Sequence, residues 1–173
     1  MTTLIAFSGS LRADSFNTRI LKALPALAPN GTNIALFDIA ELPMYNQDLD
    51  AETVPPIVEA LRVAIAEADG VIIASPEYNH SYSAMAKNLI DWASRPFMKG
   101  PIIGKKSMVI VAGPGPGGGS HCVQALTDLL TMLSGTVVAG VGIAAVHEKL
   151  SKDSDVVTDE VIAAQLSAGL AAF

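Results

Sequence analysis

The sequence predicts a doubly wound α/β fold, in which five parallel strands form one sheet between two layers of helices. Short β-branched and apolar runs alternate along the chain with segments of helical period, which is the pattern of repeated βαβ units. Most of these runs are almost wholly apolar, as expected for parallel strands covered on both faces. The chain has 173 residues and shows no linker or repeat, so one domain is expected over residues 1–173.

Five short runs are expected to form the strands. Four of them are nearly all apolar, which suits central positions in a parallel sheet. The runs cover residues 4–8, 33–37, 70–75, 107–112 and 137–143.

Apolar residues recur at helical spacing after each strand, so each segment is expected to form a helix with one apolar stripe. Right-handed crossovers place successive helices on the two faces of the sheet and give a three-layer sandwich. The stripes are Phe16, Ile20, Leu24 and Leu27; Ile57, Leu61, Ile65 and Ala68; Met85, Leu89 and Trp92; Val123, Leu126, Leu130 and Leu133; and Ile162, Leu166, Leu170 and Phe173.

Composition narrows the class of protein further. Hydrophobic residues make up 50% of the chain and the mean hydropathy is +0.42, so disorder is not expected. The longest apolar stretch, residues 136–146, contains glycines and is far shorter than the roughly 20 apolar residues of a membrane-spanning helix. No Lys or Arg precedes Arg12, so a secretory signal is not expected either.

Charge and cysteine content point to a cytoplasmic protein without a polyanionic partner. The net charge of −6 and the pI of about 4.9 argue against a nucleic-acid-binding surface. Cys122 is the single cysteine, which excludes an internal disulfide and fits a reducing compartment.

The turn after the first strand resembles a phosphate site. In doubly wound sheets, ligands bind beyond the carboxyl ends of the strands at the point where the strand order reverses. Residues 9–17 bring Ser10, Arg12, Ser15 and Asn17 to the start of a helix, where hydroxyls, backbone N–H groups, a guanidinium and the helix dipole suit a single terminal phosphate. The alternative is that Ser15 or Asp14 only caps the helix and Arg12 is a solvated charge.

The turns after the third and fourth strands suit a flat ring. Pro76 stiffens the first of these turns and Tyr78 offers a rigid wall, although an ordinary surface turn is the alternative. Residues 113–120 contain the pattern G-x-G-x-x-G, but two prolines and the position after the fourth strand argue against a dinucleotide site. Glycines that let the backbone approach a planar ligand are the preferred interpretation, and a flexible connector is the alternative. The long polar segment 42–56 is also expected to be functional.

No other catalytic pattern is apparent, and no catalytic or metal-ligating residue is assigned. The spacing of His80, His121 and His147 does not suggest metal ligands, and His121 is adjacent to Cys122 rather than arranged as its base. The G-x-S-x-G motif of hydrolases is missing. A protein of this kind is expected to rely on a cofactor for its chemistry.

Three motifs together resemble the NADPH-dependent FMN reductase family, whose members include flavodoxin-like quinone, chromate and azo-dye reductases. Their spacing extends over nearly the whole chain, which makes the joint pattern far more specific than any one motif. The motifs are Gly9-Ser10-Leu11-Arg12 with Ser15 and Asn17; Pro43-Met44-Tyr45-Asn46-Gln47-Asp48; and Ser75-Pro76-Glu77-Tyr78-Asn79 with Lys87-Asn88, Asp91-Trp92 and Ser94-Arg95-Pro96.

The resemblance implies an FMN cofactor, with NADPH or NADH as co-substrate and a small-molecule electron acceptor. It also implies a homodimer or homotetramer in which residues 92–96 approach the neighbouring subunit. The cofactor-binding residues it implies are Ser10, Leu11, Arg12, Ser15, Phe16 and Asn17 for the phosphate, and Pro76, Glu77, Tyr78, Asn79, Ser81, Gly113, Gly115 and Gly117 around the isoalloxazine ring.

The sequence departs from the family pattern at two places. Ser83-Ala84 replaces the usual Pro-Gly before the third helix, beside the bulky Tyr82, which predicts a narrower site. In the fourth helix, His121 and Thr127 stand where the family often has arginines, which weakens any transfer of tetramer contacts or of an arginine-assisted substrate site.

The expected function is hydride transfer from NAD(P)H through bound FMN to flavin, quinone or a similar acceptor, with ping-pong kinetics. The alternatives are a flavodoxin-type electron carrier and a non-catalytic FMN-binding module. Arg12 argues against the carrier, because such proteins usually have a Thr-rich phosphate loop without arginine. Arg19, farther along the same helix, is expected to be solvated.

Overall fold

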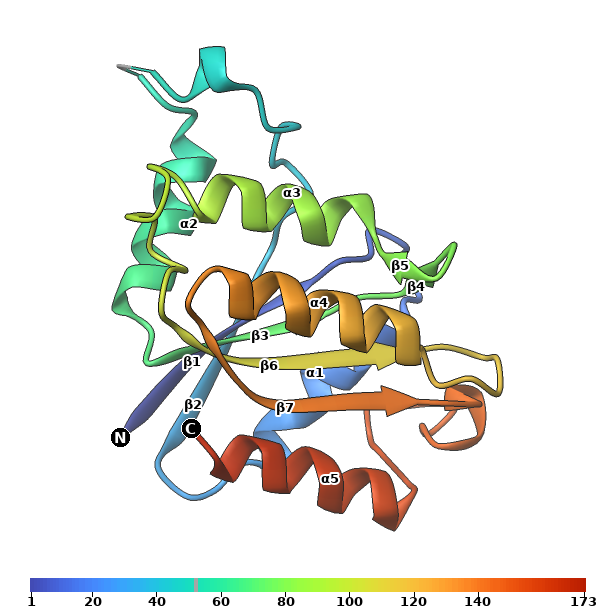
Figure 1. Ribbon diagram of the computed structural model, residues 1–173. Coiled ribbons are helices and arrows are strands. Elements are labelled where there is room, and N and C mark those ends of the chain that lie inside the picture. Colours follow the sequence, from blue (N-terminus) through green and yellow to red (C-terminus); the bar gives the residue numbers. More distant parts are fainter. Residues whose placement is uncertain (52) are drawn as a thin grey trace.

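The structure is a computed structural model that describes residues 1–51 and 53–173, and it contains the predicted parallel sheet (Figure 1). The strands run in the order β2-β1-β3-β6-β7, and every neighbouring pair is parallel. This confirms the α/β class and the five predicted strands, whose ends differ by two residues or fewer from the predicted ranges. The strands are β1 (Thr2–Ser8), β2 (Thr32–Phe37), β3 (Gly70–Ala74), β6 (Lys106–Ala112) and β7 (Thr136–Ile143).

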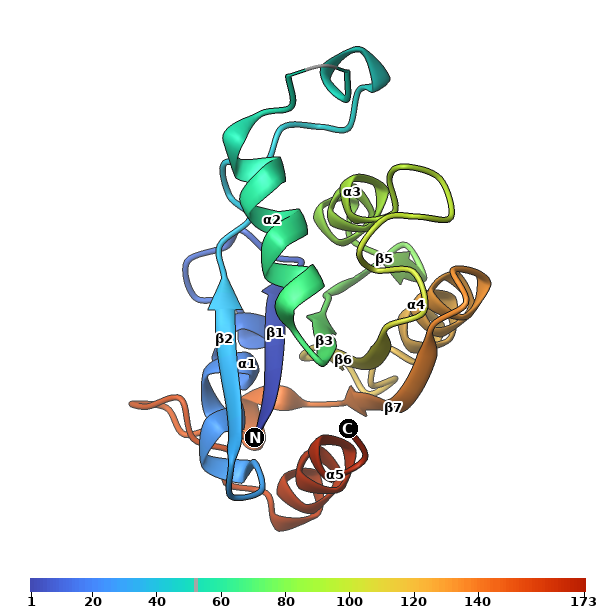
Figure 2. The same ribbon diagram turned by 90° about the vertical axis from the view of Figure 1, so that its left-hand side faces the viewer.

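Within residues 1–51 and 53–173 there are five α-helices. They cover the two faces of the sheet (Figures 1 and 2). Helices α2, α3 and α4 contribute to one buried cluster, whereas α1 and α5 contribute to the other. The predicted three-layer sandwich is therefore present. The helices are α1 (Phe16–Leu27), α2 (Pro56–Glu67), α3 (Ala84–Ala93), α4 (Ser120–Met132) and α5 (Glu160–Ala171).

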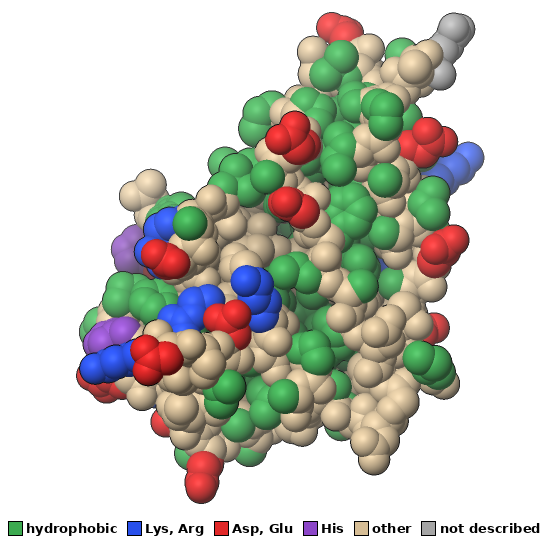
Figure 3. Space-filling model, turned by 180° about the vertical axis from the view of Figure 1, so that it is seen from behind, with side chains coloured by type: hydrophobic (Ala, Val, Ile, Leu, Met, Phe, Trp, Pro, Cys, Tyr) green, Lys and Arg blue, Asp and Glu red, His purple; other side chains and the backbone are tan. Residues whose placement is uncertain are grey.

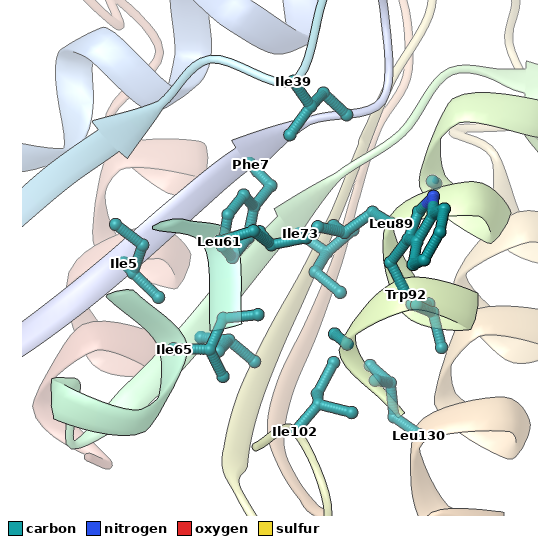
Figure 4. Packing of buried hydrophobic residues seen from close by; sticks show 14 of the residues in the cluster. Ile5, Phe7, Ile39, Leu61, Ile65, Ile73, Leu89, Trp92, Ile102 and Leu130 are labelled. Atoms are coloured by element: carbon teal, nitrogen blue, oxygen red, sulfur yellow. The ribbon is translucent and has the colours of Figure 1, made fainter. Parts of the chain in front are cut away.

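The alternation of side chains along the strands divides the core between the two faces. On β1, Ile5 and Phe7 belong to the cluster under α2, α3 and α4, whereas Leu4 and Ala6 belong to the other. Figure 4 shows Phe7 among the side chains of the first cluster, near Leu61. Fully burying one large apolar side chain stabilises the fold by about 1.5–3 kcal/mol. The two clusters therefore hold the strands, and with them the turns that follow the strands, in fixed positions.

A short hairpin after β3 was not predicted. Strands β4 (Glu77–Tyr78) and β5 (Ser81–Tyr82) pair antiparallel across Asn79 and His80. Both turn residues have positive φ, 52° and 60°, as a two-residue type I′ turn requires. Asn79 suits this conformation, but the sequence lacks the Asn-Gly signature that makes such a turn predictable.

The long segment between β2 and α2 projects beyond the sheet and contains the 3₁₀ turn η1 (Gln47–Leu49). Seen from behind, hydrophobic side chains are exposed over this projecting part (Figure 3). Met44 is 65% exposed and Leu49 is 41% exposed. Within the predicted functional segment 42–56, Glu52 lies outside the described residues.

A second 3₁₀ turn, η2 (Val146–Glu148), follows β7. Among the helices of the described residues, none has the length and apolar character needed to cross a bilayer.

Candidate functional site

A cavity of about 460 Å³ lies beyond the carboxyl ends of β1, β3 and β6. The order β2-β1-β3 reverses direction at β1, so the cavity occupies the switch point of the sheet. All three predicted turns meet there. The lining residues are Ser10, Arg12, Ser15, Phe16, Asn17, Pro76, Glu77, Tyr78, Val111, Ala112, Gly113, Pro114, Gly115, Gly117, Gly118 and Gly119.

The amino end of α1 forms one side of the cavity. Ser15 caps this helix, since its Oγ accepts a hydrogen bond from the backbone N–H of Thr18 at 3.4 Å. The first N–H groups of a helix, here those of Phe16 and Asn17, have no intrahelical acceptor, and the helix dipole makes this end positive. Ser10 Oγ accepts from the N–H of Arg12 at 3.4 Å, so both serine hydroxyls keep a proton to donate.

Arg12 adds a positive charge at this end of the helix, where it would attract an anion. Its guanidinium carbon lies 5.5 Å from the centre of the Phe16 ring, within the range of a cation–π contact. The side chain is exposed and borders the cavity. Hydroxyls, backbone donors and a guanidinium therefore converge on one end of the cavity and suit a phosphate.

The side chain of Asn17 has a structural role. Its Nδ2 donates to the carbonyl of Ala112 at 3.0 Å, and its Oδ1 accepts from the N–H of Ala112 at 2.9 Å. The buried amide thus joins α1 to the end of β6. Asn17 also borders the cavity.

Glycines leave the opposite side of the cavity open. A Cβ added to Gly113, Gly115 or Gly117 would meet no protein atom within 4 Å. The loop is nevertheless anchored, because the N–H of Gly113 donates to Ile143 and its carbonyl accepts from Val146. The loop is therefore not the flexible connector considered as the alternative. The open space beside its anchored backbone suits a planar group.

Glu77 joins the third-strand turn to α4. Its Oε2 accepts from the N–H of Cys122 at 3.0 Å, in the first turn of a helix whose N-cap residue, Gly119, has no side chain.

Burial raises the pKa of the Cys122 thiol to about 11. A hydrogen bond with Ser75 partly offsets this rise in the pKa, and the Glu77 carboxylate adds to it. The thiol is therefore protonated at neutral pH.

Ser83, which the sequence predicts to narrow the site, hydrogen-bonds backbone groups of two segments. Its hydroxyl donates to the carbonyl of Gly9 at 2.6 Å and accepts from the N–H of Ala86, which caps α3. Among the residues that the structure describes, Tyr82, Ser83 and Ala84 do not contribute to the cavity wall. The serine hydroxyl joins the first-strand turn to α3, because it both donates and accepts a hydrogen bond. A proline at this position would have no such group.

The second motif of the resemblance is held against α3 by hydrogen bonds. Asn88 Nδ2 and Trp92 Nε1 both donate to the carbonyl of Pro43, at 2.9 Å and 2.7 Å. Asn88 Oδ1 also accepts from the N–H of Tyr45, whose ring packs edge-on against Trp92. Hydrogen bonds therefore join the motif at residues 43–48 to α3 and hold the start of the projecting segment in place.

Some predicted site residues lie outside the cavity. Leu11 lines a neighbouring cavity of about 340 Å³, beside Arg12 and residues 36–40. Asn79 and Ser81 belong to the hairpin and do not border the 460 Å³ cavity in the described part of the chain.

The expectation that Arg19 is solvated is wrong, because its guanidinium binds Asp155 at 3.0 Å and the carbonyls of two serines.

One contact was missed by sequence reasoning. His80 and His121 lie 41 positions apart, yet their Nδ1 atoms are 3.1 Å apart. No spacing rule could have found this pair, since the hairpin and α4 come together only in the folded chain.

The parallel strand order β2-β1-β3-β6-β7, with a cavity at its switch point, defines a protein of the flavodoxin-like class. The model of the NADPH-dependent FMN reductase family matches residues 2–149, and the chain belongs to this family of flavin-dependent oxidoreductases.

Individual relatives agree with this assignment. The chain is 40% identical over 130 residues to an NAD(P)H-dependent FMN reductase of Pseudomonas aeruginosa, covering 75% of this chain and 70% of that protein. It is 48% identical over 120 residues to an NADPH:quinone oxidoreductase of Arabidopsis thaliana, covering 66% of this chain and 59% of the plant protein. Among solved structures, the flavoenzyme NAD(P)H:(acceptor) oxidoreductase FerB of Paracoccus denitrificans superposes with a TM-score of 0.84 at 35% identity, over 99% of this chain and 94% of FerB.

Proposed function

We propose that the chain, as one domain over residues 1–173, binds FMN in the switch-point cavity and reduces a quinone or a similar small acceptor with electrons from NADPH or NADH. The observation that carries this proposal is the meeting of an anion-binding helix end and a glycine-lined opening in one cavity. The names of the relatives, an FMN reductase and a quinone oxidoreductase, support the same cofactor and acceptor class.

The chain's own groups fit FMN. Ser10, Arg12, Ser15 and the backbone of α1's first turn would hold the phosphate, since they supply donors and positive charge. Tyr78, 57% exposed at the cavity edge, and the loop of Gly113, Gly115 and Gly117 would border the ring system. When bound, FMN supplies the capacity to accept a hydride and to pass electrons to an acceptor.

The remaining residues position these groups. Asn17 and Ser83 hold the first-strand turn against β6 and α3, and Glu77 holds the third-strand turn against α4. No side chain is assigned a proton-transfer or nucleophilic role. This suits a protein in which the cofactor performs the chemistry and the chain supplies binding and orientation.

An absorbance spectrum tests the proposal. The purified protein, incubated with FMN and desalted, should show flavin absorbance that bleaches rapidly under anaerobic conditions on addition of NADPH or NADH. Addition of benzoquinone should then restore the absorbance. A protein that stays colourless after incubation with FMN would contradict the cofactor assignment.

The same measurement separates the alternatives. An electron carrier of the flavodoxin type would bind FMN but bleach only with a partner reductase. A non-catalytic module would bind FMN and show negligible turnover with every acceptor. Arg12 in the turn between β1 and α1 favours the reductase, as do the reductase and oxidoreductase activities of the relatives.

We also propose that the protein is a cytoplasmic homodimer. The segment after α3 exposes Phe97 by 73% and Met98 by 43%, next to the residues 92–96 that the family resemblance brings to a neighbouring subunit. Burying such side chains against a second copy would remove apolar surface from water. The single buried cysteine suits a reducing compartment.

A further inference from the structure

Glu77, His80 and His121 form a cluster at the surface where the β4–β5 hairpin meets the first turn of α4. The Nδ1 atoms of the two histidines are 3.1 Å apart, and each lies 3.8 Å from Oε1 of Glu77. The rings meet edge to face, with centroids 4.5 Å apart. One ligand atom from each of these three side chains, all of kinds that bind metal ions, therefore lies within 4.8 Å of the other two.

The distances suit a small tetrahedral ion. With Zn–N bonds of about 2.0–2.1 Å and a tetrahedral angle, two ligand atoms lie about 3.4 Å apart. The nitrogen pair is slightly closer than this and the carboxylate oxygen slightly farther, so small side-chain rotations would bring all three to bonding distance. Two imidazoles and one carboxylate are also a known zinc ligand set.

Neighbouring contacts hold the carboxylate in place. Glu77 Oε2 accepts from the N–H of Cys122 at 3.0 Å, so Oε1 is left to face the histidines. Hydrogen bonds of this kind orient carboxylates that ligate metals. The histidine rings are the exposed part of the cluster, with 77% of the His80 side chain and 62% of the His121 side chain accessible.

The backbone at His80 is left-handed, a conformation in which Asn, Asp and His are the enriched residues other than glycine. His80 has φ of 60° in the second central position of a type I′ turn, where Gly is the favoured residue. A residue with a Cβ is disfavoured in this left-handed region. The turn nevertheless presents an imidazole to His121.

We propose that Glu77, His80 and His121 bind one divalent transition-metal ion of the zinc class. His80 Nδ1, His121 Nδ1 and one carboxylate oxygen of Glu77 are the ligands, and water takes the fourth position. Imidazole nitrogens favour zinc, copper and nickel over magnesium and calcium, which prefer oxygen ligands. The bound ion would tie the hairpin to α4 beside the flavin-binding cavity, whose wall includes Glu77.

The test is a titration of the metal-free, untagged protein with Zn²⁺ against a chromophoric chelator, in the absence of FMN. One ion per chain is expected, with no competition from excess Mg²⁺. Zn²⁺ should also raise the midpoint of thermal unfolding, because an ion that binds only the folded state stabilises it.

His80→Asn and His121→Ala should each weaken Zn²⁺ binding by at least about tenfold, the smallest loss expected even for an outer-shell partner. Asn is well tolerated at positive φ, so His80→Asn removes the ligand without disturbing the turn. His147→Ala is the matched control: its Nε2 lies 3.7 Å from Glu148 Oε1, a histidine–glutamate pair without a second imidazole. It should bind Zn²⁺ like the unmodified protein.

Retention of full Zn²⁺ affinity by His80→Asn or His121→Ala would overturn the proposal, as would a loss of affinity in His147→Ala equal to theirs. The contact between His80 and His121 would then be an imidazole–imidazole hydrogen bond only. Since the titration uses protein without FMN, its failure would leave the proposed reductase function untouched.

Discussion

Arg12 lies in the turn where β1 passes into α1 and contributes a guanidinium to the cavity wall. If this group pairs with the FMN phosphate, Arg12→Ala should weaken FMN binding while the fold is retained. A charge-assisted hydrogen bond contributes about 1.5–3 kcal/mol, so the affinity should fall roughly ten- to a hundredfold. Fluorescence titration with FMN measures the change.

Lys152 provides the control for this substitution, since it is an exposed cation outside the cavity. Lys152→Ala should hold FMN like the unmodified protein. Arg19 is unsuitable as a control because its ion pair with Asp155 joins α1 to the segment before α5, and its loss would alter stability as well. Equal affinities in the Arg12 and Lys152 variants would contradict the phosphate assignment.

Cys122 gives a prediction for stability at alkaline pH. Burial raises its pKa from 9.0 to about 11, so above pH 9 the unfolded chain loses the thiol proton while the folded chain keeps it. This contribution to stability is complete below pH 9 and is lost as the pH rises toward 11. Between these values, the unmodified protein should lose more free energy of unfolding than Cys122→Ala, by urea denaturation. Parallel curves for the two proteins would contradict the shift.

At the scale of elements, the glycine loop between β6 and α4 combines two kinds of glycine. Gly115 faces open space, whereas a Cβ on Gly119 would collide with the side chain of Val111. Gly119 also has φ of 71°. The first position therefore keeps room for a ligand, and the second lets the chain turn into α4.

Substitutions at these two glycines should separate binding from folding. Gly115→Val should weaken FMN binding at least about tenfold and change stability by less than about 0.5 kcal/mol, as surface substitutions usually do. Gly119→Ala should lower stability by about 1–3 kcal/mol through overpacking and backbone strain. FMN titration and urea denaturation of both variants check this. Normal FMN affinity in Gly115→Val would show that the open space is not the flavin site.

The β4–β5 hairpin and the segment before α2 show how elements position one another. Glu77 caps α4 from the hairpin, and Asn88 and Trp92 of α3 hold the carbonyl of Pro43. Each contact satisfies a backbone group that a loop or helix end would otherwise leave to water. Such side chains fix the loops around the cavity without facing the ligand.

At the scale of the whole molecule, exposed apolar residues bear on the proposed dimer. If Phe97 packs against a second copy, Phe97→Asp should shift the protein from dimer to monomer, because a charge replaces apolar contact area. Met132, 66% exposed on α4, is the matched control, and Met132→Asp should remain dimeric. Light scattering coupled to size-exclusion chromatography measures the mass. A monomeric unmodified protein, or a dimeric Phe97→Asp variant, would contradict the proposal.

The sequence by itself determined the class of fold and the three turns that carry the candidate site. Both depend on local patterns: apolar runs, helical periodicity, and turn residues that follow strands in a fixed order. The reversal of strand order brings these turns to one edge of the sheet, so the sequence alone predicts that Arg12, Tyr78 and the glycine loop lie together.

Only the tertiary structure decided which side chains serve the ligand and which hold the loops. Asn17 and Ser83 have the residue types of a binding site, yet both side chains bond backbone groups of distant segments, Asn17 those of Ala112 and Ser83 the carbonyl of Gly9. The contact of His80 with His121 likewise depends on how the hairpin packs on α4. Hydrogen bonds are directional and short-ranged, so their partners follow from the positions of packed elements, which no spacing along the chain specifies.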